Sequence, residues 1–220
     1  LSQDYWLYNR FARAAAKTSE LVLIGDSVVW GLYVRPDETL SHDLNALAGH
    51  AWCANLGLDG AHPVALAGLV ENYGAGIRGK TVLLQCNPLW LSTPRHDLQE
   101  EAESEFNHPR LIPQFRPWIA CYKKDISPRI GIVVERNVPF LAWASHLQQV
   151  YFDQKDIPSW TLEHPYDNPI APLERGLPPS DATLRHEPIP WTERGITPQN
   201  FPWVEPEHSL QWRFFLRTIE

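Results

Sequence analysis

The chain has 220 residues, a length that suits one domain with a sizeable core, so we expect residues 1–220 to fold as a single domain. It carries 19 Lys and Arg against 26 Asp and Glu, a formal net charge of −7, which argues against a nucleic-acid partner because phosphate neutralisation needs clustered basic residues. No apolar run reaches the ~18 residues of a membrane span, and the first residues lack a signal-peptide pattern, so a place outside the cytoplasm would require a leader or anchor that has been removed.

The first informative element is an apolar run that ends in a sharp polar turn. Residues 21–24 are all branched aliphatic, which predicts a buried parallel strand, and Gly25, Asp26 and Ser27 follow directly. Small residues let the chain turn so that a serine hydroxyl stands above the sheet edge, where open α/β sheets bind ligands. The same residues also suit an ordinary strand-to-helix turn in which Asp26 or Ser27 caps the helix.

Two further predicted strands also end in a hydrogen-bond donor. Residues 51–56 run into a loop that ends at Gly60, and a helical pattern follows over residues 63–73. Residues 81–86 end at Asn87, which is followed by a proline. Ser27, Gly60 and Asn87 can each donate a hydrogen bond to an anion, so the three strand ends together predict an anion-stabilising site.

The order and spacing of these three blocks resemble the SGNH (GDSL-type) hydrolases, over roughly residues 20–90. The resemblance implies an α/β fold of three α/β/α layers, flavodoxin-like, with a parallel sheet. It also implies that Ser27 is the nucleophile, with Gly31 completing Gly-Asp-Ser-x-x-x-Gly. The backbone N–H of Gly60 and the side-chain amide of Asn87 would then form the oxyanion hole.

The implied chemistry is that of a serine esterase. A base takes the proton of the serine hydroxyl, and fixed donors stabilise the tetrahedral oxyanion formed by attack on an ester. The resemblance implies small acyl esters as substrates, with acetylated carbohydrates among them, and neither a cofactor nor a metal. Transfer of the acyl group to a sugar hydroxyl is a close variant of the same reaction if water is excluded.

The third block departs from the family pattern. The family has Gly-x-Asn-Asp there, whereas this chain has Gln85, Cys86, Asn87 and Pro88. The proline removes one backbone N–H and fixes its own φ, so other contacts must hold the loop.

The base is the second departure, because no Asp-x-x-His follows Asn87. The nearest form places Glu205 as the orienting carboxylate and His208 as the general base. Residues 208–220 have an amphipathic helical pattern that resembles the helix before the family's fourth strand. The alternative is therefore a base beyond Glu220, in which case the chain would lack the C-terminal part of the fold.

We expect residues 92–206 to form an insertion that is repeatedly interrupted by proline. The pattern predicts a short acidic helix over 97–106 and a longer helix over 130–151 that Pro139 kinks or breaks. Residues 156–206 predict extended, Pro- and Trp-rich chain over the active-site face or a partner surface. Its aromatic residues either bury themselves to hold this segment or contact a sugar ring or acyl chain; they are Trp160, Tyr166, Trp191, Phe201 and Trp203.

Other reactive side chains favour structural roles. Three cysteines, Cys53, Cys86 and Cys121, lack metal or redox spacing and predict small buried hydrophobes. No histidine pair has metal-ligand spacing. We expect structural, hydrogen-bonded histidines, among which His62 should lie nearest the pocket because it follows Gly60; the set is His62, His146, His164 and His186.

A second class of function is a noncatalytic SGNH-like module that binds a glycan or protein through the Pro- and Trp-rich segment. The missing Asp-x-x-His favours it, and the intact set of Ser27, Gly60 and Asn87 opposes it. The two classes differ in whether a histidine nitrogen lies within hydrogen-bond reach of the Ser27 hydroxyl.

Overall fold

The protein is built around a parallel β-sheet, seen here in a computed structural model that describes residues 3–32, 34–152, 155–163, 190–195 and 197–220. The strands of this part of the chain are β1 (Leu21–Ile24), β2 (Cys53–Asn55) and β3 (Thr81–Leu84). Their order in the sheet is β2-β1-β3, and both pairings are parallel. The α/β class and the parallel sheet are thereby confirmed.

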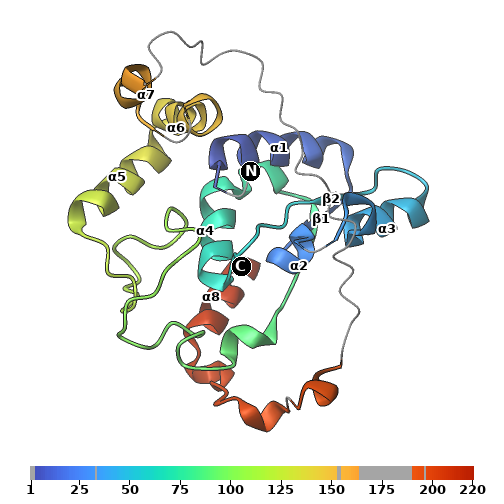
Figure 1. Cartoon of the computed structure of the whole chain (residues 1–220). Helices are drawn as coiled ribbons and strands as arrows, with labels where there is room; N and C mark the ends of the chain where they lie inside the picture. Colours follow the sequence, from blue (N-terminus) through green and yellow to red (C-terminus); the bar gives the residue numbers. More distant parts are fainter. Residues whose placement is uncertain (1–2, 33, 153–154, 164–189, 196) are drawn as a thin grey trace.

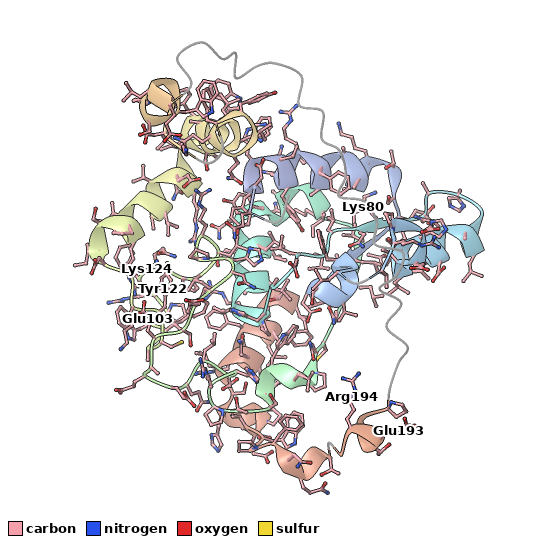
Figure 2. The ribbon with its side chains drawn as sticks, viewed as in Figure 1. Lys80, Glu103, Tyr122, Lys124, Glu193 and Arg194 are labelled. Carbon is pink, nitrogen blue, oxygen red and sulfur yellow. The ribbon has the colours of Figure 1, made fainter. Side chains whose placement is uncertain are left out.

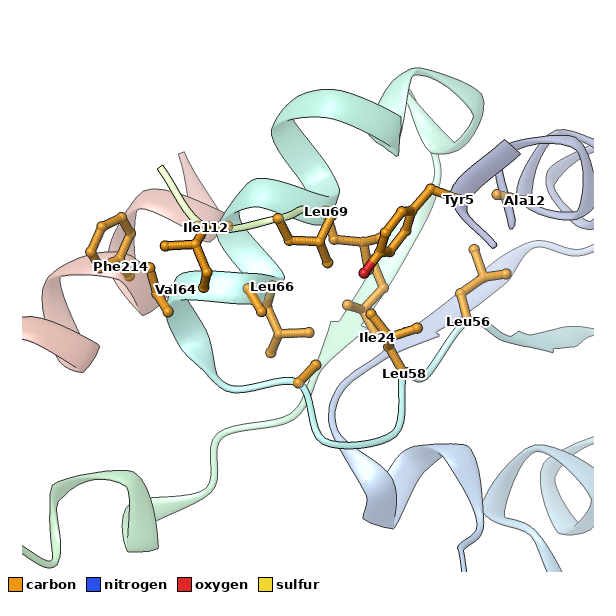
Figure 3. Packing of buried hydrophobic residues seen from close by; sticks show 14 of the residues in the cluster. Tyr5, Ala12, Ile24, Leu56, Leu58, Val64, Leu66, Leu69, Ile112 and Phe214 are labelled. Atoms are coloured by element: carbon orange, nitrogen blue, oxygen red, sulfur yellow. The ribbon is translucent and has the colours of Figure 1, made fainter. Parts of the chain in front are cut away.

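Helices cover both faces of the sheet, an arrangement compatible with three α/β/α layers. They are α1 (Tyr5–Thr18), α2 (Ser27–Trp30), α3 (Leu40–Ala48), α4 (Pro63–Tyr73) and α8 (Leu210–Ile219). On one face, Val22 and Ile24 pack with residues of α1, α4 and α8 (Figures 1 and 3). On the other face, Leu21 and Leu23 pack with Val29 of α2 and with α3. Strand β1 is buried throughout because its side chains alternate between these two apolar layers.

The central helix α4 occupies the residues predicted for it, 63–73, and is almost completely buried in its first two turns. The segment around Leu111 crosses α4 closely at Gly68. A Cβ on Gly68 would lie only 1.9 Å from the Leu111 carbonyl oxygen. Helix α8 packs along α4 (Figure 1) and agrees with the amphipathic pattern of residues 208–220. Its Phe214 belongs to the same apolar cluster as Val64 and Leu66 (Figure 3).

The predicted acidic helix over residues 97–106 is wrong. Asp97 is fully buried, and its carboxylate accepts hydrogen bonds from the backbone N–H groups of Leu210 and Gln211, both at 2.9 Å. It also accepts from the hydroxyl of Ser209, the residue that caps α8. The carboxylate is therefore committed to the positive N-terminal end of a helix far along the chain, which the local acidic composition does not reveal.

Pro139 breaks the helix predicted over residues 130–151. Helix α5 covers Ile126–Asn137 and α6 covers Pro139–Tyr151. Between them Val138 is extended (φ −112°, ψ 101°), because a residue that precedes proline avoids the helical region.

The prediction of extended chain for residues 156–206 is wrong at its start. Helix α7 covers Ile157–Glu163, and its Trp160 is buried edge-on against Phe152, 5.4 Å between ring centres. Trp203 stays 38% exposed and contacts Phe201. Tyr166, His164 and His186 lie outside the described residues. The short 3₁₀ turns in the described part of the chain are η1 (Pro36–Glu38), η2 (Gly74–Ile77), η3 (Pro88–Leu91), η4 (Trp191–Arg194), η5 (Pro198–Asn200) and η6 (Pro206–His208).

A buried arginine organises the irregular chain before α5. Arg129 donates to the carbonyl oxygens of Gln114, Tyr122 and Lys124, and its guanidinium lies over the Tyr122 ring at 4.7 Å (Figure 2 labels Tyr122 and Lys124). Backbone groups that would otherwise lack partners are thereby satisfied.

No helix in the described ranges is long and apolar enough to cross a bilayer.

Candidate active site

The turn after β1 presents Ser27 as the first residue of α2. Asp26 is the N-cap, and its carboxylate accepts from the backbone N–H of Val28 at 2.9 Å. Gly31 ends the helix at φ +93°, and a Cβ there would lie 2.7 Å from the Thr39 methyl. The capping interpretation of this turn is therefore confirmed for Asp26. It leaves Ser27 half-buried at the carboxyl end of β1, where a nucleophile would also stand.

Gln85 fixes the turn from the neighbouring strand end. Its side-chain oxygen accepts from the backbone N–H of Asp26 at 2.9 Å. Gly25 makes room for it, because a Cβ on Gly25 would lie 2.4 Å from the Gln85 Oε1. Gln85 stands where the family pattern has glycine, and no motif in the sequence indicated this positioning role.

Asn87 is joined to the same turn through its side-chain amide. Its Nδ2 donates to the second carboxylate oxygen of Asp26 at 2.9 Å, and its Oδ1 accepts from the backbone N–H of Leu89 at 3.1 Å. Pro88 follows as the first residue of η3, a position where a missing N–H is tolerated. An amide carries two N–H groups, so Asn87 keeps one donor for a ligand while Asp26 fixes its orientation.

The loop after β2 packs closely on α2. Asn55 donates to the Val29 carbonyl oxygen at 2.6 Å and accepts from the Gly57 backbone N–H at 2.9 Å. A Cβ on Gly57 would lie 2.5 Å from the backbone nitrogen of Trp30. Gly60 then adopts φ +68°, a conformation that favours glycine.

Four donors at these strand ends have no hydrogen-bond partner among the residues that the structure describes. Across the described ranges, no hydrogen bond is formed by the backbone N–H groups of Ser27 and Gly60 or by the Ser27 hydroxyl. The second N–H of Asn87 is also unused. Asp26 links Ser27 to Asn87, and the bond from the Leu58 N–H to the Gly25 carbonyl, 2.9 Å, links the turn to the Gly60 loop. Such donors suit a developing oxyanion.

The histidines beside this edge are held in the neutral form. His62 precedes α4, and burial together with His108 lowers its pKa to about 4. His62 was expected to be hydrogen-bonded, but its buried Nδ1 has no hydrogen-bond partner among the described residues. Its ring lies edge-on to Phe106 at 5.5 Å. His108 bonds to the Tyr5 hydroxyl at 2.8 Å and the Asp59 carbonyl oxygen at 2.5 Å, and burial lowers its pKa as well.

Glu205 and His208 lie in another loop, at the start and the end of η6. Both side chains are exposed. The Val204 N–H donates to the Leu91 carbonyl oxygen at 2.8 Å, so this loop runs beside the end of η3. The backbone N–H of His208 donates to the Glu205 carbonyl oxygen at 2.9 Å, but no hydrogen bond or ion pair of the described residues joins the His208 ring to the Glu205 carboxylate or to Ser27. Their roles as base and orienting carboxylate stay predictions.

The remaining reactive residues divide by burial. His146 bonds to Asp4 through Nδ1 at 2.6 Å, consistent with a structural role. Cys53 and Cys121 are buried as predicted, whereas Cys86 is exposed because β3 ends at Leu84, before it.

Comparison of the chain with protein-family models, curated proteins and solved structures finds no match in any of the three.

Proposed function

We propose that the protein is a serine esterase of SGNH type that acts on small acyl esters, with acetylated carbohydrates among its substrates. The observation that carries the proposal is the hydrogen bond between the Asp26 carboxylate and the Asn87 amide, 2.9 Å. Helix capping needs only the other oxygen of Asp26, the one that accepts from Val28. The bond to Asn87 gives a second strand end a fixed donor beside Ser27.

The reaction follows from these groups. The Ser27 Oγ attacks the ester carbonyl while a base takes its proton, and the carbonyl oxygen becomes an oxyanion. The free N–H groups of Ser27, Gly60 and Asn87 donate hydrogen bonds to that oxyanion without changing protonation state. The alcohol leaves with a proton, and water then releases the acid from the acyl-enzyme. The base is His208 oriented by Glu205, or a histidine contributed from outside residues 1–220.

A noncatalytic module that binds a glycan or protein is the second candidate. The observation in its favour is that the Ser27 hydroxyl donates no hydrogen bond to a histidine of the described residues. A serine without a base is a weak nucleophile. Acyl transfer to a sugar hydroxyl uses the same site as hydrolysis, and the two reactions differ only in the acceptor.

Labelling with a fluorophosphonate probe separates the candidates, because the probe reacts with activated serines. We expect labelling of the native chain, loss in Ser27→Ala, and full labelling in Ser127→Ala, which removes an exposed serine at the start of α5. Reduced labelling in His208→Ala would identify the base. If the folded 220-residue chain stays unlabelled while a C-terminally extended chain is labelled, the base lies outside residues 1–220. If both stay unlabelled although circular dichroism shows them folded, the esterase is rejected and the binding module favoured.

A further inference from the structure

A second polar site lies away from the Ser27 turn, in a cavity of about 210 Å³. Its walls come from the C-terminal half of α4, the irregular segment 111–116, α5 and α8. Three arginines line it, Arg116, Arg136 and Arg217, with Glu71 as the one carboxylate among its lining residues. The cavity therefore holds two more positive than negative charges in a chain whose net charge is −7.

Arg136 is held in place by backbone carbonyl groups. Its Nε donates to the Arg110 carbonyl oxygen at 2.5 Å, and one terminal nitrogen, Nη2, donates to the Ile112 carbonyl oxygen at 2.8 Å. The other, Nη1, has no hydrogen bond from the described residues. Burial lowers the pKa of the guanidinium, but an arginine remains charged in a protein. A fixed cation with a free donor thus lies in the cavity wall.

Arg116 and Arg217 supply the other two positive charges of the cavity. Arg217 forms an ion pair with Glu71 at 2.9 Å, and both side chains are about half exposed. Arg116 is exposed, and neither it nor Arg136 forms an ion pair with a carboxylate of the described ranges. Charge that is half-buried and unpaired is costly unless an anion compensates for it.

We infer that this cavity binds a small tetrahedral oxyanion, either free phosphate or the phosphoryl group of a small ester. Guanidinium groups present pairs of N–H donors that match phosphate oxygens. The volume is several times the ~30 Å³ that one water occupies in the liquid. It is smaller than the roughly 300 Å³ at which pockets for drug-sized ligands begin. The size therefore suits one phosphoryl group, with an ester substituent directed to solvent.

The test is isothermal titration calorimetry of the full chain with inorganic phosphate, and separately with glycerol phosphate, at constant ionic strength. We expect saturable binding of at least one. Binding should weaken roughly tenfold in Arg116→Gln and again in Arg217→Gln, because each removes a charge-assisted contact. Glu71→Gln should strengthen binding, since it removes the competing carboxylate.

Arg213→Gln is the matched control. It removes the same charge from α8, one turn before Arg217, at a residue that does not line the cavity. Retained affinity in this variant would show that the cavity matters, not the net charge. Absence of binding to both ligands, or equal weakening in Arg116→Gln and Arg213→Gln, would overturn the inference. Tighter binding of glycerol phosphate than of phosphate would identify an ester as the ligand.

Discussion

The sheet edge and the chain after it are stabilised in different ways. Between residues 21 and 91, short apolar strands end in turns that carry local caps. The carboxylate of Asp26, for example, accepts from the backbone N–H of Val28, two residues further along the sequence. After residue 91, the buried carboxylate of Asp97 bonds to backbone far along the sequence, since it accepts from the N–H of Gln211, 114 residues away. The first region can be recognised from local pattern, whereas the second depends on a few buried polar anchors.

The largest expected effect comes from removing such an anchor. In Asp97→Ala, the N–H groups of Leu210 and Gln211 and the hydroxyl of Ser209 lose their acceptor inside the protein. We expect the free energy of unfolding to fall by about 3 to 5 kcal/mol, measured by urea denaturation.

Asp125→Ala is the control for this prediction. Asp125 precedes α5 as Ser209 precedes α8, but its side chain makes no capping hydrogen bond and is exposed. A loss within about 0.5 kcal/mol is expected. Equal losses in the two variants would contradict the view that Asp97 anchors the second region.

The fold near the sheet could be predicted because its signals are local. The aliphatic run before Gly25 marks β1, and Pro63 marks the start of α4. The roles of Gln85 and Arg129 could not be predicted, since each bonds to backbone that comes near only in the folded chain. Helix α1 also went unpredicted, although Asp4 caps it, because its mean hydropathy is low and the residues it buries are one tyrosine, Tyr5, and two small alanines, Ala12 and Ala16.

The residues of the candidate site also differ in whether a local pattern could identify them. Ser27, Gly60 and Asn87 were identified from short motifs, and their strands end at one edge of the sheet. The base was not identified in the same way, because the chain after Asn87 contains no Asp-x-x-His motif. His208 and Glu205 illustrate this, since spacing suggested the pair and no bond of the described residues joins their side chains.

The esterase proposal predicts the next largest effect, on rate. Asn87→Ala removes the donor that Asp26 orients, so kcat for a small acyl ester should fall by about 10²- to 10³-fold, with little change in KM. Asn45→Ala is the control, because Asn45 also bonds to the backbone, at Cys53, but lies on α3. Its stability should fall while the kcat of the folded protein is retained. Similar kcat losses in both variants would argue against an oxyanion role.

A pH effect is expected from His62. Its pKa is about 4 in the folded protein against about 6.5 in the unfolded chain, so the unfolded state binds more protons between these values. Stability conferred by the neutral ring is present above about pH 6.5 and is lost as the pH falls toward 4, by up to about 3 kcal/mol.

The measurement is urea denaturation between pH 4 and 7. His62→Phe keeps an aromatic ring against Phe106 and should flatten the pH dependence. His42→Phe, at an exposed position, should leave the dependence unchanged. A native slope that persists in His62→Phe would assign the effect to another group.

The smallest effect is expected at Gly60, where local conformation and a distant contact can be separated. A left-handed φ of +68° strains any side chain by about 1 to 2 kcal/mol. A Cβ there would also lie 2.1 Å from the Asn107 amide nitrogen. Gly49 has φ +72° with nothing within 4 Å, so Gly49→Ala measures the strain alone. Gly60→Ala should therefore lose more stability in thermal unfolding than Gly49→Ala. Adding Asn107→Ala to the Gly60→Ala variant should recover the extra stability that was lost, so that the difference from Gly49→Ala disappears. Equal losses would mean that the turn is specified by φ alone and that the contact from the second region adds nothing.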